Sequence, residues 1–325
     1  MIKHIRIQNF RSFVDAEVDL QPFSLVLGAN GSGKTNLLRF FSTISGTRTI
    51  LLSNNEWTKH GNLLNLDAGF ELQNEITVKG IQSIVRQVPA IVIDDSISAL
   101  DHKLPIYSIN PNSISNIEPA IPKPTVAGDG SGTAQVLHSL KSGDREDLFD
   151  KIEENFRRYV PEVEKLSLRT VEQGKIQIQV REKGLDAPLP ATDLSDGTRL
   201  ILAILTILHQ ENPPAVILLE DIDRGLHPRL FEYVVPLMKD IAERNQVNIL
   251  ATSHNPYLVD CFQDNKEAVI IVEKRDGAST LTTLAKRLEG LDYEKENPED
   301  MPLGNLWFTG LVGGTPAKLG GKKKH

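Results

Sequence analysis

The feature that most constrains the fold is GANGSGKT at residues 28–35, which lies between a strand-like and a helix-like segment. It fits the pattern G-x-x-x-x-G-K-[ST], in which glycines let the backbone curl so that successive N–H groups point at phosphate oxygens. FSLVL before it has the character of a short buried strand. After it, Leu37, Phe41 and Ile44 recur at helical spacing. This order of strand, loop and helix predicts a site for a nucleoside triphosphate.

The loop supplies most of the expected ligand contacts. The start of the following helix adds a positive dipole end. The Lys34 ammonium is expected to reach the β- and γ-phosphates, and the Thr35 hydroxyl to bind Mg²⁺. The expected cofactors are therefore ATP and Mg²⁺. The residues predicted to bind the nucleotide are Gly28, Ala29, Asn30, Gly31, Ser32, Gly33, Lys34, Thr35 and Asn36.

Two adjacent carboxylates, Glu220 and Asp221, follow the apolar run AVILL at residues 215–219. Open α/β sheets bind ligands at the carboxyl ends of their strands, so the pair is expected beside the phosphate loop. A phosphate-bound Mg²⁺ needs a further oxygen partner, and hydrolysis needs a group that orients water. Successive side chains of a strand point to opposite sides, so the two acids need not share one role. Without the phosphate loop, an acidic loop after a strand would be the simpler interpretation.

Two other stretches are candidates for phosphate contacts. LSDGT at residues 194–198 opens an apolar helix-like run, and its serine and glycine backbone is suited to an anion at that helix start. By itself it is only a helix-capping signal. His254, in TSHNP, follows the strand-like VNILAT. A histidine there can contact a γ-phosphate, although a lone histidine at a strand end is more often structural.

The remaining pattern alternates strands with helices. Strands are expected at KLSLRTV and KIQIQV, a helical region at residues 130–160 with a break at Ser142-Gly143, and a helix at residues 229–245. Residues 268–284 are expected to form a hairpin with its turn at Asp276-Gly277. This alternation favours a mainly parallel sheet with helices on both faces. Residues 46–124, rich in Pro, Ser and Asn, predict a loop-rich variable insertion.

Charge and composition exclude several classes. The 325-residue chain has a net charge of −7, so no global positive field attracts nucleic acid. A single cysteine excludes an internal disulfide and a cysteine-based metal cluster. The longest apolar stretch, residues 200–208, is far below the ~20 residues of a membrane span, which predicts a cytoplasmic protein without membrane contact. Any contact with DNA rests on small basic clusters best interpreted as solvated surface: Lys3, His4, Arg6 and Arg11; Arg157 and Arg158; and Lys322 to Lys324.

The order NFRSF, GANGSGKT, LSDGT, ILLEDIDRGLHP, TSHNP resembles the ABC-type ATPase heads of the RecF and SMC group. It looks most like the bacterial predicted ATPases labelled "AAA family", which are similar to the ATPase half of OLD proteins. The resemblance implies a P-loop NTPase of α/β class, with an ABC/SMC-head-like mixed sheet, helices on both faces and an inserted helical and loop subdomain. The implied divisions are an ATPase core at residues 1–45 and 191–290, an insertion at 46–190 and a polar C-terminal tail at 291–325.

The resemblance also implies a nucleotide-sandwich homodimer, in which the phosphate loop of one subunit faces the LSDGT signature of the other. Ser195 and Gly197 would then serve the γ-phosphate in trans, and His254 matches the switch histidine. The family's usual text is DEPExGLHP, and GLHP is present at residues 225–228. Counting back puts Glu220 in the place of the metal-binding Asp and Asp221 in the place of the Glu that positions water. The two acids are exchanged in length, which predicts slow hydrolysis.

Three functions remain open. The first is an ATP-hydrolysing dimeric switch in DNA maintenance or anti-phage defence, acting with a separately encoded effector such as a nuclease or toxin. A fused Toprim nuclease is not expected, because the stretch after His254 is shorter than the ~100 residues of a further domain. The second is a nucleotide sensor with negligible turnover, which the exchanged acids favour. The third is a transporter's nucleotide-binding subunit, which LSDGT in place of LSGGQ and GLHP in place of an SALD-type loop disfavour.

Overall fold

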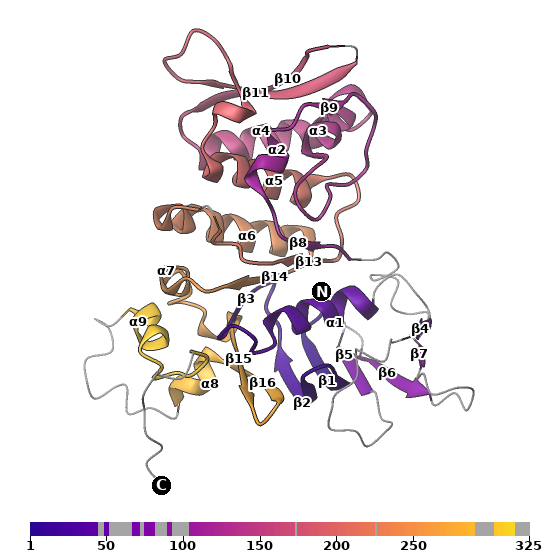
Figure 1. The fold of residues 1–325 in the computed structure, drawn as a ribbon, viewed down its shortest axis with the longest axis vertical. Helices are drawn as coiled ribbons and strands as arrows, with labels where there is room; N and C mark the ends of the chain where they lie inside the picture. The colour runs from indigo at the N-terminus through magenta and orange to yellow at the C-terminus, as the bar shows by residue number, and fades with distance from the viewer. Residues whose placement is uncertain are drawn as a thin grey trace. The chain divides into compact units, whose positions relative to one another are not determined.

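The computed structural model describes residues 1–44, 49–51, 67–71, 75–81, 90–92, 104–172, 174–224, 226–289 and 302–315. The chain divides into two compact units, whose elements are labelled in Figure 1. Unit 1 comprises Met1–Leu104, Ala215–Asp221 and Ala242–His325. Unit 2 comprises Pro105–Pro214 and Ile222–Ile241.

The centre of unit 1 is a run of parallel strands. Their order is β13 (Val216–Leu219), β14 (Asn248–Ser253), β3 (Phe23–Leu27) and β15 (Val269–Arg275). Every residue of β3, β13 and β14 is buried, as is usual for parallel strands covered on both faces. Ser253 pairs with Leu27 and Ala251 with Leu219, so these three strands end at one edge. The predicted core strands are confirmed.

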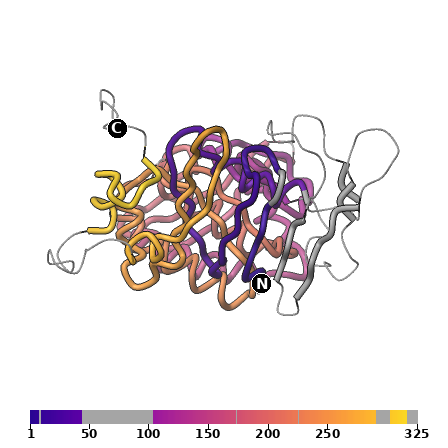
Figure 2. The backbone as a smooth tube through the Cα atoms, turned by 90° about the horizontal axis from the view of Figure 1, so that it is seen from below, coloured from indigo at the N-terminus to yellow at the C-terminus, as the bar shows by residue number. Residues whose placement is uncertain are grey.

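The outer strands of unit 1 pair mostly antiparallel. β1 (His4–Phe10) pairs with β2 (Phe13–Asp19), and β15 pairs with β16 (Ala278–Thr283), which contacts β2 in parallel. Figure 2 shows these N-terminal strands beside the C-terminal hairpin. Beyond β1, the antiparallel pairings continue through β5 (Asp67–Glu71), β6 (Glu75–Ile81), β7 (Ala90–Val92) and β4 (Thr49–Leu51).

A mixed sheet is therefore confirmed, whereas the expectation of a mainly parallel sheet is wrong for the described strands. The physical reason is the short connections, because two-residue turns join only antiparallel neighbours. The turn predicted at Asp276-Gly277 is confirmed, with φ of 49° and 88°, as a two-residue hairpin of this kind requires.

Helices complete unit 1. α1 (Lys34–Ile44) contacts β14 and buries Leu37, Leu38, Phe40 and Phe41. The other short helices are α7 (Pro256–Asp260), η5 (Lys266–Ala268), α8 (Leu284–Glu289) and α9 (Leu303–Phe308). The predicted helix α6 (Phe231–Asn245) is confirmed and is preceded by η4 (Pro228–Leu230). η4 and α6 up to Ile241 belong to unit 2, and only the last turn of α6 belongs to unit 1. None of the helices in the described part of the chain has the length and apolar character needed to cross a membrane.

Unit 2 is a helical layer with a small antiparallel sheet. The sheet consists of β9 (Glu118–Pro119), β10 (Val163–Thr170), β11 (Lys175–Glu182) and β12 (Leu189–Pro190). The short strand β8 (Ile106–Tyr107) lies in the same stretch of the chain but is not part of this sheet. Its helices are α2 (Pro111–Ile114), α3 (Thr133–Ser142), α4 (Glu146–Tyr159), η3 (Ala191–Asp193) and α5 (Asp196–His209). The strands KLSLRTV and KIQIQV and the break after Ser142 are confirmed. α5 packs against α2, α3 and α4 and buries almost all of its length.

The expected divisions stay a prediction, and the structure describes two segments of them. The signature helix α5, expected in the ATPase core, belongs to unit 2. Residues 302–315, expected in a polar tail, form α9 and a turn that bury Leu303, Leu306, Trp307 and Val312. Most of the expected loop-rich insertion lies outside the described residues, but strands β4 to β7 fall within it.

His209, at the end of α5, gives unit 2 a pH-dependent stability. Its Nδ1 lies 3.0 Å from the Leu205 carbonyl oxygen and its Nε2 3.4 Å from Asn155 Nδ2. These contacts fit a neutral ring that carries its proton on Nδ1. Burial lowers the pKa of His209 below its ordinary value. Protons therefore bind preferentially to the unfolded chain, so this stability is complete above about pH 6.5 and is lost as pH falls below it.

We expect His209→Gln to reduce the fall in Tm between pH 7 and pH 5. The amide keeps one donor and one acceptor but takes up no proton in this range. Circular dichroism melts at pH 5, 6 and 7 measure the effect, with His227→Gln, at an exposed position, as the matched control. An unchanged pH dependence in His209→Gln would contradict the assignment.

Candidate nucleotide-binding site

The phosphate loop, residues 28–35, joins β3 to α1 and requires its glycines. The backbone is left-handed at Gly31 (φ 75°) and at Gly33 (φ 123°). A Cβ at Gly33 would lie 2.6 Å from Ser279 Oγ, and one at Gly28 would lie 2.5 Å from the Val272 carbonyl oxygen. The Leu37 N–H donates to the Gly33 carbonyl at 3.0 Å, which starts the first helical turn. The curled conformation predicted from the motif is thus present.

The groups inside the loop fit a phosphate. The Lys34 side chain is buried, and its Nζ donates to the carbonyl oxygens of Gly28 (2.7 Å) and Ala29 (3.1 Å). A phosphate would offer this ammonium stronger, charged acceptors. Ser32 Oγ is also buried and has no hydrogen-bond partner among the described residues. A buried ammonium and an unpaired hydroxyl in a glycine-rich loop suit an anionic ligand.

The metal ligands predicted from the sequence lie together. Thr35 lies on the first turn of α1, and Glu220 directly follows β13. Thr35 Oγ1 donates to Glu220 Oε1 at 2.6 Å. A hydroxyl and a carboxylate are hard oxygen ligands of the kind that Mg²⁺ takes beside nucleotide phosphates. The donor set therefore fits the expected ion.

The second acid and the histidine also meet. Asp221 Oδ1 lies 4.0 Å from His254 Nε2, and both side chains are partly exposed. His254 directly follows β14, and Asn255 after it caps α7 by accepting the Tyr257 N–H. The Asp221 backbone is left-handed, with φ 51°, and its N–H donates to Thr252 Oγ1 at 2.9 Å. Unit 1 thus gathers the phosphate loop, both acids and His254.

A cluster of hydroxyl groups that contacts the phosphate loop was not predicted from the sequence. Ser279 Oγ lies 2.8 Å from Ser12 Oγ and 2.5 Å from the Ser32 carbonyl oxygen. Asn36 Nδ2 donates to Ser12 Oγ at 2.9 Å. The only sequence signal was the place of Ser12 in NFRSF. Ser279, 267 positions later in the chain, carried none.

The C-terminal turn also touches the loop. A Cβ at Gly314, where φ is 73°, would lie 2.7 Å from Ile271 Cγ2 and 3.7 Å from Gly28 Cα. The Gly314 N–H donates to Glu273 Oε1 at 3.0 Å, and Glu273 also pairs with Arg287. The segment expected to be a tail therefore packs against the first glycine of the phosphate loop.

We expect Gly314→Ala to weaken ATP binding severalfold, because its Cβ would clash with Ile271 Cγ2 and shift the turn that lies beside Gly28. A left-handed alanine also costs about 1–2 kcal/mol. Gly310→Ala is the matched control, because φ is 82° and its Cβ would approach only Thr315 Oγ1. Titration with a fluorescent ATP analogue and thermal melts separate the two effects. Both variants should lose stability, and equal ATP affinity in both would contradict the contact's importance.

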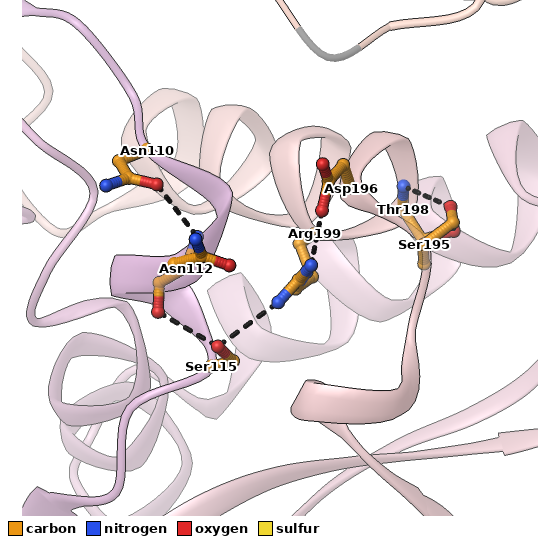
Figure 3. Close-up of polar contacts among 7 residues, drawn as sticks. All are labelled: Asn110, Asn112, Ser115, Ser195, Asp196, Thr198 and Arg199. Atoms are coloured by element: carbon orange, nitrogen blue, oxygen red, sulfur yellow. Dashed lines mark hydrogen bonds and ion pairs between the residues drawn. The ribbon is translucent and has the colours of Figure 1, made fainter.

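The signature residues lie at the start of α5 in unit 2 (Figure 3). Ser195 is exposed and caps the helix, its Oγ accepting the Thr198 N–H at 3.1 Å. Asp196 pairs with Arg199, which is buried and also donates to Ser115 Oγ at 3.2 Å. Asp196 occupies a position where the LSGG pattern has glycine, and the ion pair with Arg199 offsets its negative charge.

Gly197 is buried rather than exposed. A Cβ there would lie 2.9 Å from Leu230 Cδ1, so a larger residue at this position would displace the Leu230 side chain. Ser195 is therefore the more accessible of the two predicted signature residues.

Comparisons with known proteins agree with this geometry. Residues 23–260 match the family described as "AAA domain, putative AbiEii toxin, Type IV TA system". An OLD nuclease from Thermus scotoductus is 22% identical over an alignment of 334 residues. This alignment covers 84% of the present chain. The chain spans 62% of the length of that relative.

Solved structures that share this fold include SMC heads. The SMC head domain from Thermotoga maritima has a TM-score of 0.55 and 16% identity, covering 87% of this chain and 98% of that one. An SMC head bound to the C-winged helix domain of ScpA has a TM-score of 0.59 and 14% identity, covering 89% and 99%. The predicted likeness to an SMC/RecF-type ATPase head and to the ATPase half of OLD proteins is confirmed. Because the family match runs from β3 to α7 and covers most of the chain, the protein belongs to the family of AAA domains described as putative AbiEii toxins of type IV toxin–antitoxin systems.

Proposed function

We propose that the protein binds ATP, hydrolyses it slowly and works as a dimeric switch. The observation that carries the proposal is the contact between Thr35 Oγ1 and Glu220 Oε1 at 2.6 Å. It joins the phosphate loop to the acid pair at the carboxyl edge of β3, β14 and β13, where open α/β sheets bind ligands. Membership of a P-loop ATPase family supports the same conclusion.

Each residue has a defined task in this proposal. The loop N–H groups and the Lys34 ammonium bind the β- and γ-phosphates. Thr35 and Glu220 would hold Mg²⁺, which neutralises charge on the phosphates when bound. Asp221 orients the attacking water and accepts a hydrogen bond from it. His254, 4.0 Å from Asp221, contacts the γ-phosphate and so helps to fix the geometry of attack.

The dimer is proposed from the signature. Ser195 is exposed at the N-terminus of α5, where its hydroxyl and the helix dipole suit an anion. The Asp196–Arg199 pair reduces the repulsion that an acid beside a phosphate would otherwise cause. These features support a sandwich in which Ser195 of one subunit, with the backbone of Gly197, meets the γ-phosphate bound by the other.

We expect Ser195→Arg to leave ATP binding by the isolated subunit intact and to block the ATP-dependent dimer, because the long side chain fills the space of the partner's phosphate. Light scattering and a fluorescent-ATP titration measure the two properties. Asp186→Arg, exposed in the turn after β11, is the control for an added surface arginine. Loss of ATP binding by Ser195→Arg would show that its role is not in trans.

The proposed switch acts in anti-phage defence or DNA maintenance with a nuclease or toxin as effector; the family description names a toxin–antitoxin system, and the relative from Thermus scotoductus is a nuclease. A nucleotide sensor with negligible turnover is the second candidate, because Asp221 is shorter than the Glu expected there. Phosphate release at saturating ATP separates the two. We expect turnover below ~1 s⁻¹, the lower end of common phosphoryl-transfer rates, but above that of Lys34→Ala. Release equal to that of Lys34→Ala would favour the sensor.

A further inference from the structure

The backbone at Asp221 adopts a conformation that needs support. Its φ of 51° lies in the left-handed region, which is unfavourable for a residue with a Cβ. Aspartate and asparagine tolerate this region better than most residues, whereas glutamate has no such preference. The short acid therefore suits position 221 for reasons that lie in the backbone.

The same turn explains the long acid before it. Glu220 continues from the end of β13 and reaches Thr35 Oγ1 at 2.6 Å. An aspartate there would stop about one C–C bond short. The order Glu then Asp thus fits the two positions. The longer side chain of Glu220 reaches the phosphate loop, and the shorter side chain of Asp221 suits a left-handed backbone.

One side chain holds this turn. Thr252, on the neighbouring strand β14, is 1% exposed, and its Oγ1 accepts the Asp221 N–H at 2.9 Å. It lies two residues before His254, so one strand end fixes the backbone of the acid and carries the histidine beside it. The hydrogen bond from the Asp221 N–H fixes the orientation of this peptide plane. It thereby also fixes the direction in which the side chain leaves the backbone.

We propose that Thr252 is a positioning residue for the attacking water, acting through the Asp221 peptide. The inference rests on the proposed function, in which Asp221 orients that water. A shift on the order of 1 Å in such a group costs ~10²-fold in rate. Nucleotide binding does not depend on the Asp221 side chain, because the phosphate loop binds the phosphates and Thr35 and Glu220 would hold Mg²⁺.

Thr252→Val keeps the shape and removes the acceptor, and Thr252→Ser restores it. We expect Thr252→Val to slow single-turnover hydrolysis roughly 10- to 100-fold while ATP affinity stays within about twofold. Without nucleotide, hydrogen exchange at residues 220–222 should become faster in Thr252→Val and return toward native in Thr252→Ser. Thr133→Val is the matched control, because Thr133 is fully buried and its hydroxyl donates to the Gly130 carbonyl in unit 2. If the valine variant does not fold, Thr252→Ala removes the same acceptor.

The outcomes separate the inference from the proposed function. Native-rate hydrolysis by Thr252→Val, beside an inactive Asp221→Asn, overturns the positioning role alone. A parallel loss of ATP affinity and rate overturns it as well, because Thr252 would then be structural. Native-rate hydrolysis by Asp221→Asn overturns the proposed role of Asp221 and the positioning role with it.

Discussion

Lys34→Ala is expected to abolish ATP binding rather than only to slow hydrolysis. The ammonium is the main side-chain charge available to the β- and γ-phosphates, and charge-assisted hydrogen bonds to phosphate are among the strongest in proteins. The ammonium also donates to the carbonyls of Gly28 and Ala29, so its removal loosens the loop that binds the phosphates. Titration with a fluorescent ATP analogue should show no saturation at millimolar concentrations.

The control for this loss is Lys175→Ala, which removes an exposed lysine from β11 in unit 2. It should bind ATP as the native protein does. Circular dichroism of Lys34→Ala should retain the native spectrum, because the strands β3, β13 and β14 do not depend on its side chain. Native ATP affinity in Lys34→Ala would mean that the nucleotide lies elsewhere.

Asp221→Asn is expected to keep ATP affinity, to remove most hydrolysis and to accumulate the ATP-bound dimer. The amide has the shape of the carboxylate and is tolerated at a left-handed residue, so the hydrogen bond from the backbone to Thr252 survives. Only the negative charge that orients the water is lost. Phosphate release under single-turnover conditions measures the effect, which should approach the background of Lys34→Ala.

Glu220→Gln is the matched comparison, because it neutralises the other acid. It should instead weaken Mg²⁺-dependent ATP binding, since it removes charge from the group that contacts Thr35. If Asp221→Asn hydrolyses ATP at the native rate, His254, 4.0 Å from Asp221, becomes the better candidate for handling the water.

Short sequence patterns predicted much of this candidate site. Glycine spacing and a strand before it predicted the phosphate loop, and apolar runs that end in acids or histidine predicted the edge where Glu220, Asp221 and His254 lie. Asp276-Gly277 predicted its hairpin, because left-handed φ values at both positions favour these residues. Each of these signals is contained within a few consecutive residues.

The features that escaped prediction depend on contacts between distant segments. Ser12 and Ser279 meet under the phosphate loop, and Gly314 packs against Gly28, although no short pattern links them. Leu303, Leu306 and Trp307 of α9 have helical spacing, but the pattern covers too few residues to predict a helix in a polar, glycine-rich segment. The left-handed backbone at Asp221, with its hydrogen bond to β14, could not be predicted, so the sequence showed the exchanged acids without a structural reason for them.

The central claim is that ATP joins two copies of the chain through the signature. Multi-angle light scattering of Asp221→Asn, with and without ATP and Mg²⁺, tests it most directly because hydrolysis cannot dissolve the complex. We predict the monomer mass of 36.0 kDa without nucleotide and twice that mass with it. The monomer mass at micromolar protein and saturating ATP would contradict the account.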